Sequence, residues 1–201
     1  MVEASRLCYT LLGYIRGESG TGALSKLLKT TQYEIGVDAG RELRKPHELR
    51  HPSVDFDWFE KRVAKYERKI AQDREYGLAF RGQADVQHYI ELNLDLLRKS
   101  PVRFQHDDYH PDNLIVREGR LEGIIDFNRC DWGDPVEDFY KVPWFTTTVS
   151  IPFARGQVEG YLADRPLERF WDRYNFDRPQ SPRQPGLRAR RRHGLVAEEA
   201  G

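Results

Sequence analysis

The sequence contains few cysteines and no long apolar run. Cys8 and Cys130 are the two cysteines among 201 residues, too few for a disulfide framework or a thiolate metal cage. This scarcity indicates a reducing compartment, and we expect a cytoplasmic protein. No apolar run reaches the roughly 18 residues of a membrane span, and the start of the chain, MVEASRLCYT, lacks the regions of a signal peptide. We therefore expect neither membrane insertion nor secretion.

The sequence also lacks an excess of either charge. Lysine and arginine total 32 and aspartate and glutamate total 32, so the formal net charge is zero. A balanced chain has no general attraction to nucleic acid or to an anionic membrane, and neither is expected as a partner. Aromatic residues make up 12% of the chain, which indicates a packed globule rather than a disordered polymer.

The first part of the chain is expected to form a strand, a linker and a helix. The apolar run 7–15 is short enough for a buried strand. The three glycines of residues 17–22 match neither spacing of a phosphate-binding loop, so we interpret them as a flexible linker. Thr31 and Glu34 have the spacing of a capping box, which predicts a helix that begins there and ends before Pro46.

The middle of the chain predicts two helices, a strand and a hairpin. Apolar positions in 56–70 step by three and four residues, which predicts an amphipathic helix with its aromatic residues in the core. Residues 86–97 repeat the pattern, and 102–105 predict a short strand. The runs 114–116 and 121–125 flank a turn that contains glycine, which predicts a β-hairpin.

One loop concentrates groups that can bind a cation or accept a proton. Residues 106–113 read HDDYHPDN. Asp108 is followed five positions later by Asn113, the D-x-x-x-x-N spacing of kinase catalytic loops. In those loops the aspartate accepts the proton of the attacking hydroxyl, and the asparagine carbonyl binds magnesium. The spacing therefore makes Asp108 a candidate base and Asn113 a candidate metal ligand.

A second candidate metal ligand, Asp126, follows the predicted hairpin. If Glu118 faces Leu121 across the turn, then Asn113 faces Asp126. Directly opposed residues have Cβ atoms ~4.5–5.5 Å apart, close enough to share a divalent ion. Because an oxygen-only pair suits magnesium, we expect Asn113 and Asp126 to hold Mg²⁺.

Two segments resemble the aminoglycoside phosphotransferases and related small-molecule kinases. FQHDDYHPDNLIV and GIIDFNRCDWGDPVEDF are similar to the catalytic-loop and metal-aspartate segments of that family. The resemblance implies an α+β, mainly helical fold like the C-terminal lobe of a protein kinase, with a catalytic-loop β-hairpin. It implies ATP and Mg²⁺ as cofactors, Asp108 as the catalytic base, and Asn113 and Asp126 as magnesium ligands. The implied activity is ATP-dependent phosphoryl transfer to the hydroxyl group of a small molecule.

The resemblance covers roughly residues 7–174 and extends to the nucleotide site. YTLLGYIRGE is similar to the family's strand and hinge, whose backbone contacts adenine. By this resemblance the expected nucleotide-binding residues are Gly13, Tyr14 and Ile15.

The same resemblance suggests how the chain is divided. A helix is expected to start near 167, and after Phe176 prolines and clustered arginines without apolar periodicity indicate a disordered tail. The expected parts are a hinge-like strand and linker (1–22), a kinase-like C-terminal lobe (23–174) and the tail (175–201). In this division the family's N-terminal lobe, with its Gly-rich loop and phosphate-binding lysine, is largely absent.

The loop departs from the family pattern at Asp107, where the family usually has glycine. If the family's glycine adopts a positive φ, an aspartate at this position is strained, although aspartate tolerates such a backbone better than most residues. The added carboxylate is also expected to raise the pKa of Asp108. We expect His106 to hold the loop by hydrogen bonds and His110 to be exposed.

Two questions stay open at the level of sequence. Asp134, Glu137 and Asp138 could bind a cationic acceptor such as an aminosugar, or they could cap the start of a helix. The function has alternatives too. The chain could be a truncated, catalytically inactive relative that acts as a binding or non-functional fragment, or a metal-dependent hydrolase that uses the histidines and aspartates of 106–110.

Overall fold

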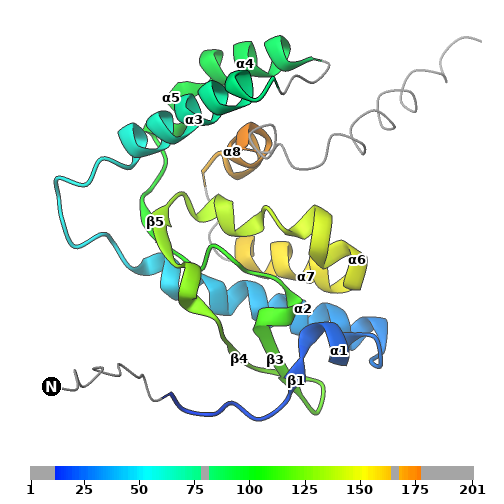
Figure 1. Ribbon diagram of the computed structural model, residues 1–201. Coiled ribbons are helices and arrows are strands. Elements are labelled where there is room, and N and C mark those ends of the chain that lie inside the picture. Colours follow the sequence, from blue (N-terminus) through cyan, green and yellow to red (C-terminus); the bar gives the residue numbers. More distant parts are fainter. Residues whose placement is uncertain (1–11, 78–81, 164–167, 178–201) are drawn as a thin grey trace, which may run out of the picture.

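The computed structural model describes residues 12–77, 82–163 and 168–177 (Figure 1). These residues are mainly helical with two small antiparallel sheets, as the sequence predicts. The elements, with η for 3₁₀ and π segments, are β1 (Glu18–Ser19), α1 (Gly20–Leu24), α2 (Lys29–Arg44), η1 (Pro46–Glu48), α3 (Trp58–Glu75), α4 (Gln83–Leu92), α5 (Leu94–Arg98), β2 (Arg103–Gln105), η2 (Pro111–Asn113), β3 (Leu114–Arg117), β4 (Arg120–Ile124), η3 (Phe127–Arg129), β5 (Asp131–Gly133), η4 (Pro135–Phe139), η5 (Val142–Thr146), α6 (Thr147–Val149), α7 (Ile151–Leu162) and α8 (Phe170–Asp177).

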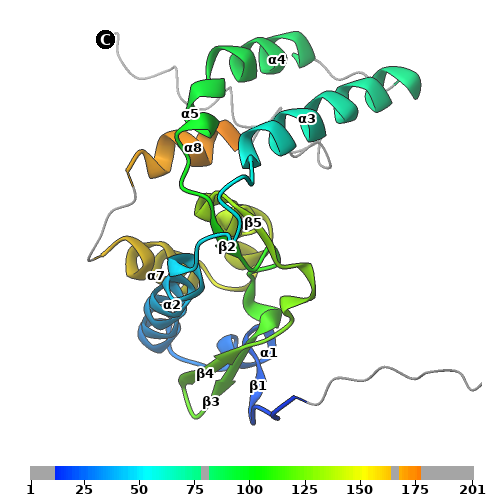
Figure 2. The ribbon, with the colours of Figure 1, turned by 90° about the vertical axis from the view of Figure 1, so that its left-hand side faces the viewer.

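The helices α2 and α7 lie side by side in both views (Figures 1 and 2). A Cβ atom added to Gly40 would lie 2.2 Å from the carbonyl oxygen of Gln157, and one added to Gly160 would lie 2.2 Å from the carbonyl oxygen of Val37. Real Cβ atoms do not come so close, so glycine at these positions lets the two backbones touch. The glycines that make this contact are Gly36, Gly40, Gly156 and Gly160.

Two hydrophobic clusters form the core. The larger lies among α2, α7 and the β3–β4 hairpin, and its fully buried members include Leu24, Ile35, Leu43, Leu114, Phe139 and Phe153. The smaller joins α3, α4, α5 and α8, the upper part of Figure 2, and consists of Trp58, Ile90, Leu96, Leu97 and Phe176. Phe56, Phe59 and Tyr66 pack against it. This confirms that the aromatic positions of 56–70 belong to the core.

The predicted hairpin is present and belongs to a three-stranded sheet. Its strands β3 and β4 are antiparallel, and β1 pairs with the other side of β3. Glu118 and Gly119 form the turn with φ angles of 51° and 73°, as a two-residue hairpin turn requires. A second sheet pairs β2 with β5, which confirms the predicted strand near 102–105.

Two expectations for the N-terminal part are wrong, and a third, the strand over 7–15, is contradicted in its described residues. Within the expected linker, residues 18–22 form β1 and the start of α1. They fold because they dock on the hairpin and on Pro111, whose carbonyl oxygen would be 2.6 Å from a Cβ atom on Gly20. Residues 12–16 form no strand, and the rest of the expected strand lies outside the described residues. The helix α2 begins at Lys29 without a side-chain cap, so the capping box at Thr31 is absent.

The other helices follow the apolar pattern with shifted ends. Asp57 caps α3 by accepting a hydrogen bond from the Glu60 amide (2.9 Å). The helix expected over 86–97 is divided at Asn93 into α4 and α5. The last expected helix appears as α8, although residue 167 lies outside the described residues. No helix in the described ranges is long and apolar enough to cross a membrane.

Candidate active site

Residues 106–113, which we call the catalytic loop after the role expected for them, run from the end of β2 to η2, and Asp138 of η4 fixes the first of them. The Asp138 carboxylate accepts hydrogen bonds from the backbone amides of His106 (2.9 Å) and Asp107 (2.6 Å). It also contacts His47 Nε2 at 2.9 Å, and His47 Nδ1 lies 2.8 Å from the Tyr161 hydroxyl. All these side chains except that of Asp107 are buried. A buried network from α7 therefore holds the loop backbone.

His106 is a structural residue, as expected. Its side chain is fully buried. Its Nε2 lies 2.8 Å from the Ile125 carbonyl oxygen, and its Nδ1 accepts a hydrogen bond from the Asp108 amide (3.2 Å). Because both ring nitrogens are used inside the protein, His106 is not available as a metal ligand. This argues against the hydrolase alternative, which needs it.

Asp107 adopts a positive φ, with a value of 57°. Only a few per cent of residues other than glycine occupy this region, and Asp is among those that tolerate it. Asp126 has a similar backbone, with φ 63° and ψ 57°. Two aspartates of the candidate site thus adopt the left-handed conformation, which is often found at functional sites.

Asp108 and Asn113 lie at opposite ends of the loop and are joined by a hydrogen bond. The Asn113 Nδ2 donates to the Asp108 carbonyl oxygen at 2.8 Å. The Asn113 side chain is nearly buried, with 7% of its surface exposed. Since the amide nitrogen is engaged, the carbonyl oxygen Oδ1 is the atom left for a cation.

The hairpin brings the segment that carries Asp126 to Asn113, but not in the expected register. Glu118 forms the turn rather than facing Leu121, and Leu121 pairs with Val116. At the base, the Ile125 amide donates to the Asn113 carbonyl oxygen (2.9 Å), so Asn113 faces Ile125 and Asp126 follows. A bulge between Ile115 and Val116 changes the register along the hairpin. The predicted direct opposition of Asn113 and Asp126 is therefore wrong by one residue.

The two candidate metal ligands fit a hard cation. Asp126 is exposed, and its Oδ1 accepts a hydrogen bond from Asn128 Nδ2 (2.7 Å), which orients the carboxylate. Together, Asn113 and Asp126 offer only oxygen donors. Magnesium prefers such donors and takes few from the protein, because phosphate and water supply the rest.

Three basic side chains surround the candidate base, and the sequence did not predict them. Lys141 forms an ion pair with Asp108 Oδ1. His110 Nε2 lies 3.4 Å and Arg129 Nη1 lies 4.0 Å from the same oxygen. The expectation that His110 is exposed is wrong, since 15% of its side chain is accessible and its ring stacks on Phe145. Burial lowers the pKa of His110.

The acidic segment after β5 serves the structure. The fully buried Asp134 caps the Val136 amide (3.0 Å), accepts from Ser100 (2.6 Å) and pairs with Arg173 (3.2 Å). Asp138 holds the catalytic loop, as described above. Glu137 pairs with Arg62 at 3.1 Å. The structure therefore favours a structural role for these acidic residues over the binding of a cationic acceptor.

The hinge-like residues approach the same hairpin. The side chain of Ile15 lies against Gly123 of β4, where an added Cβ atom would be 2.7 Å from Ile15 Cδ1. Tyr14 is 84% exposed, and an added Cβ atom on Gly13 would meet no atom within 4 Å. The structure thus brings Ile15, but not the side chain of Tyr14, to the hairpin that carries the candidate metal site.

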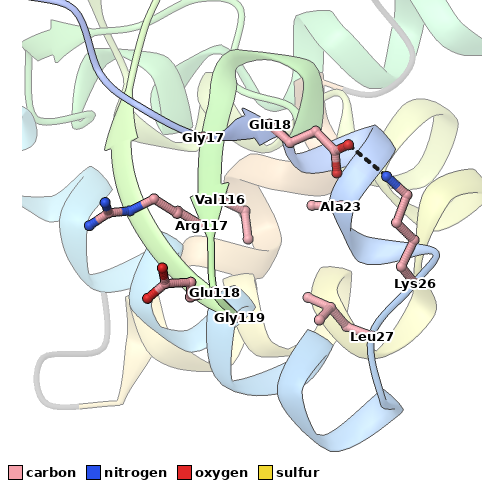
Figure 3. Close-up of a pocket in the computed structure, with 9 residues that line it drawn as sticks. All are labelled: Gly17, Glu18, Ala23, Lys26, Leu27, Val116, Arg117, Glu118 and Gly119. Carbon is pink, nitrogen blue, oxygen red and sulfur yellow. Dashed lines mark hydrogen bonds and ion pairs between the residues drawn. The ribbon is translucent and has the colours of Figure 1, made fainter.

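A pocket of about 340 Å³ lies on another part of the hairpin, beside α1 (Figure 3). Lys26 and Glu18 form an ion pair of 2.6 Å at its edge. Val116, Ala23 and Leu27 supply apolar lining. The pocket is not lined by any residue of the candidate site.

A family model described as the phosphotransferase enzyme family matches residues 2–171. The chain belongs to this family. Among curated proteins, none matches the chain at a significant level.

Solved structures similar to this phosphotransferase family member are aminoglycoside phosphotransferases. The gentamicin complex of APH(2″)-IIa has 23% identity and a TM-score of 0.60, over 81% of this chain and 58% of that one. The ADP-bound APH(2″)-Ib has 22% identity and a TM-score of 0.58, over 80% and 58%. The streptomycin–ATP complex of APH(2″)-IIa has 21% identity and a TM-score of 0.59, over 82% and 59%. These likenesses establish the kinase-like fold, and the chain spans less than three-fifths of each neighbour's length.

Proposed function

We propose that this chain transfers a phosphoryl group from ATP to a hydroxyl group of a small molecule. The observation that carries the proposal is the hydrogen bond from Asn113 Nδ2 to the Asp108 carbonyl (2.8 Å). It ties the candidate metal ligand to the candidate base within one loop. Membership of the phosphotransferase family supports the same chemistry.

Asp108 would act as the general base. Its side chain is 16% exposed, so a hydroxyl group can reach it while most of the carboxylate is kept from water. Enzymatic phosphoryl transfer depends chiefly on positioning and on compensation of charge. The buried contacts of Asp138 and His106 with the loop backbone provide the positioning.

Asn113 and Asp126 would hold Mg²⁺ through oxygen atoms. Bound magnesium would offset the negative charge of the phosphates of ATP. The amide of Asn128 and the backbone contact between Asn113 and Ile125 orient these ligands before the metal binds.

Gly13, Tyr14 and Ile15 would contact the adenine of ATP through backbone atoms. The packing of Ile15 on Gly123 supports this, because it places the segment against the hairpin of the metal site. The ADP and ATP complexes among the similar structures also support nucleotide binding.

The acceptor would be a small alcohol, and aminoglycosides are the first to test. The similar structures include complexes with gentamicin and streptomycin. A cationic acceptor would have to bind through acids other than Asp134 and Asp138, because both are buried.

The test is a coupled binding and turnover measurement on the purified chain. Calorimetry would measure binding of ATP with magnesium, and ADP formation would be followed with and without aminoglycosides and simple amino alcohols. We expect nucleotide binding and acceptor-dependent ADP formation. The Asp108→Asn variant should bind ATP as the wild type does and lose at least about 100-fold in kcat, because general base catalysis contributes about 10²–10⁴-fold.

The outcomes separate the alternatives. Absence of nucleotide binding would exclude independent kinase activity of this chain. Binding without turnover would favour the catalytically inactive relative. Full turnover by Asp108→Asn would remove Asp108 as the base.

A further inference from the structure

Lys141 contacts the candidate base from the segment between η4 and η5. Its Nζ pairs with Asp108 Oδ1, the oxygen that His110 and Arg129 also approach, at 3.4 Å and 4.0 Å. Oδ1 is fully buried. Lys141, His110 and Arg129 therefore all approach the same buried oxygen of the Asp108 carboxylate.

The backbone around Lys141 is fixed. Its carbonyl oxygen accepts hydrogen bonds from the amides of Trp144 (3.2 Å), Phe145 (2.8 Å) and Thr146 (3.2 Å). The Nζ lies 5.7 Å from the centre of the Phe145 ring, which stacks on His110. With 23% of its side chain exposed, Lys141 is held at the site rather than extended into solvent.

Charge compensation explains why an ammonium group is stable here. Burial lowers the pKa of Lys141, and the carboxylate of Asp107 acts in the opposite direction. Removing a charged group from water is unfavourable unless an opposite charge contacts it. Asp108 supplies that contact, and the charges of Asp112 and Asp126 act on the neighbouring His110.

We propose that Lys141 is a positioning residue for phosphoryl transfer, which holds Asp108 through Oδ1 and leaves Oδ2 to accept the proton of the acceptor hydroxyl. The inference rests on the proposed function. In the transfer step the acceptor O–H bond breaks and its proton moves to Asp108 Oδ2. The acceptor oxygen bonds to the γ-phosphorus of ATP, the bond from that phosphorus to the β–γ bridging oxygen breaks, and ADP leaves.

A double-mutant cycle tests the pairing without requiring activity. The wild type, Lys141→Met, Asp108→Asn and the double variant are compared by urea unfolding. We expect Lys141→Met to shift the urea midpoint of the wild type. In the Asp108→Asn background, the same substitution should cause less than about half of that shift, because the effects of substituting two residues in contact are not additive. Equal shifts in the two backgrounds would overturn the inference, whether or not the chain is an active kinase.

Turnover then tests the positioning role. We expect Lys141→Met to lower kcat at least about 10-fold and to leave the KM for ATP unchanged, because a misplaced base slows the transfer step without weakening nucleotide binding. Lys141→Arg should retain a larger part of kcat. Lys69→Met is the matched control, because it removes a lysine–aspartate pair with Asp73 (2.8 Å) within α3. An unchanged or increased kcat in Lys141→Met would overturn the inference. Absence of ADP formation by the wild type would instead refute the proposed function, and the cycle would still decide whether Lys141 holds Asp108.

Discussion

The imidazole of His106 lies 2.8 Å from the carbonyl oxygen of Ile125, and this contact joins the catalytic loop to the segment that carries Asp126. The candidate base and one candidate metal ligand come from different parts of the chain. A single buried side chain therefore contributes to the alignment of both.

Replacing His106 with phenylalanine should destabilise the protein. The aromatic contacts of His106 with Tyr109 and Phe127 would be retained, but the Ile125 carbonyl and the Asp108 amide would lose their partners. We expect the free energy of unfolding to fall by about 1–3 kcal/mol, measured by urea unfolding. If His106→Phe had the same free energy of unfolding as the wild type, the two hydrogen bonds would make no net contribution to stability.

Replacing Asp107 with glycine should stabilise the loop. Glycine adopts a φ of 57° without the steric cost that a side chain carries. The amide that donates to Asp138 is unchanged. We expect the free energy of unfolding to rise by up to about 1 kcal/mol. Asp107→Ala is the matched control and should be less stable than the wild type, since it keeps a Cβ atom and loses the short polar group.

Replacing Gly160 with alanine should separate α7 from α2. The new methyl group would lie 2.2 Å from the Val37 carbonyl oxygen, which is backbone and cannot rotate away. We expect a loss of about 1–3 kcal/mol or more in thermal or urea unfolding. Gly22→Ala in α1 is the control, because an added Cβ atom meets ordinary contacts from 3.6 Å outward. Gly22→Ala lies in a helix and should leave stability unchanged or increase it. Equal losses of stability in Gly160→Ala and Gly22→Ala would contradict the packing argument.

Replacing Tyr33 with phenylalanine should change how stability depends on pH. The Tyr33 hydroxyl donates to Glu159 (2.6 Å), and this bond, with one from Arg155, lowers the pKa of Glu159. A carboxylate with a lowered pKa in the folded state contributes stability above its unfolded pKa, and this contribution is lost as the pH falls through the folded value. We expect a small difference in Tm between wild type and variant at pH 7 that shrinks as the pH falls below the unfolded pKa of glutamate, about 4.3. A difference that stays constant with pH would show that the charge of Glu159 is not involved.

Local patterns were sufficient to propose the candidate base and to predict one of the core helices. The spacing of Asp108 and Asn113 is set within one loop, and the amphipathic pattern of 56–70 reflects a single helix face, so both could be predicted from neighbouring residues. The glycine that the family usually has at position 107 drew attention to a positive φ there, which the structure shows at Asp107.

Features that depend on distant parts of the chain could not be predicted. The hairpin register changes at a bulge between Ile115 and Val116, at the two positions where β1 pairs with β3. Since β1 contains only two residues, its sequence alone gives no strand signal. The contact of Lys141 with Asp108 joins segments on either side of the hairpin, and nothing in the sequence around Lys141 indicates it.

The network from Tyr161 through His47 to Asp138 has a consequence for how variation in α7 would be tolerated. Tyr161 is the neighbour of Gly160, where α7 touches α2. A substitution that displaces this helix by a fraction of an ångström would move the support of the catalytic loop while the chain remains folded. The proposed phosphoryl transfer should therefore decline earlier than stability in a series of α7 variants, so thermal melting alone would underestimate their damage.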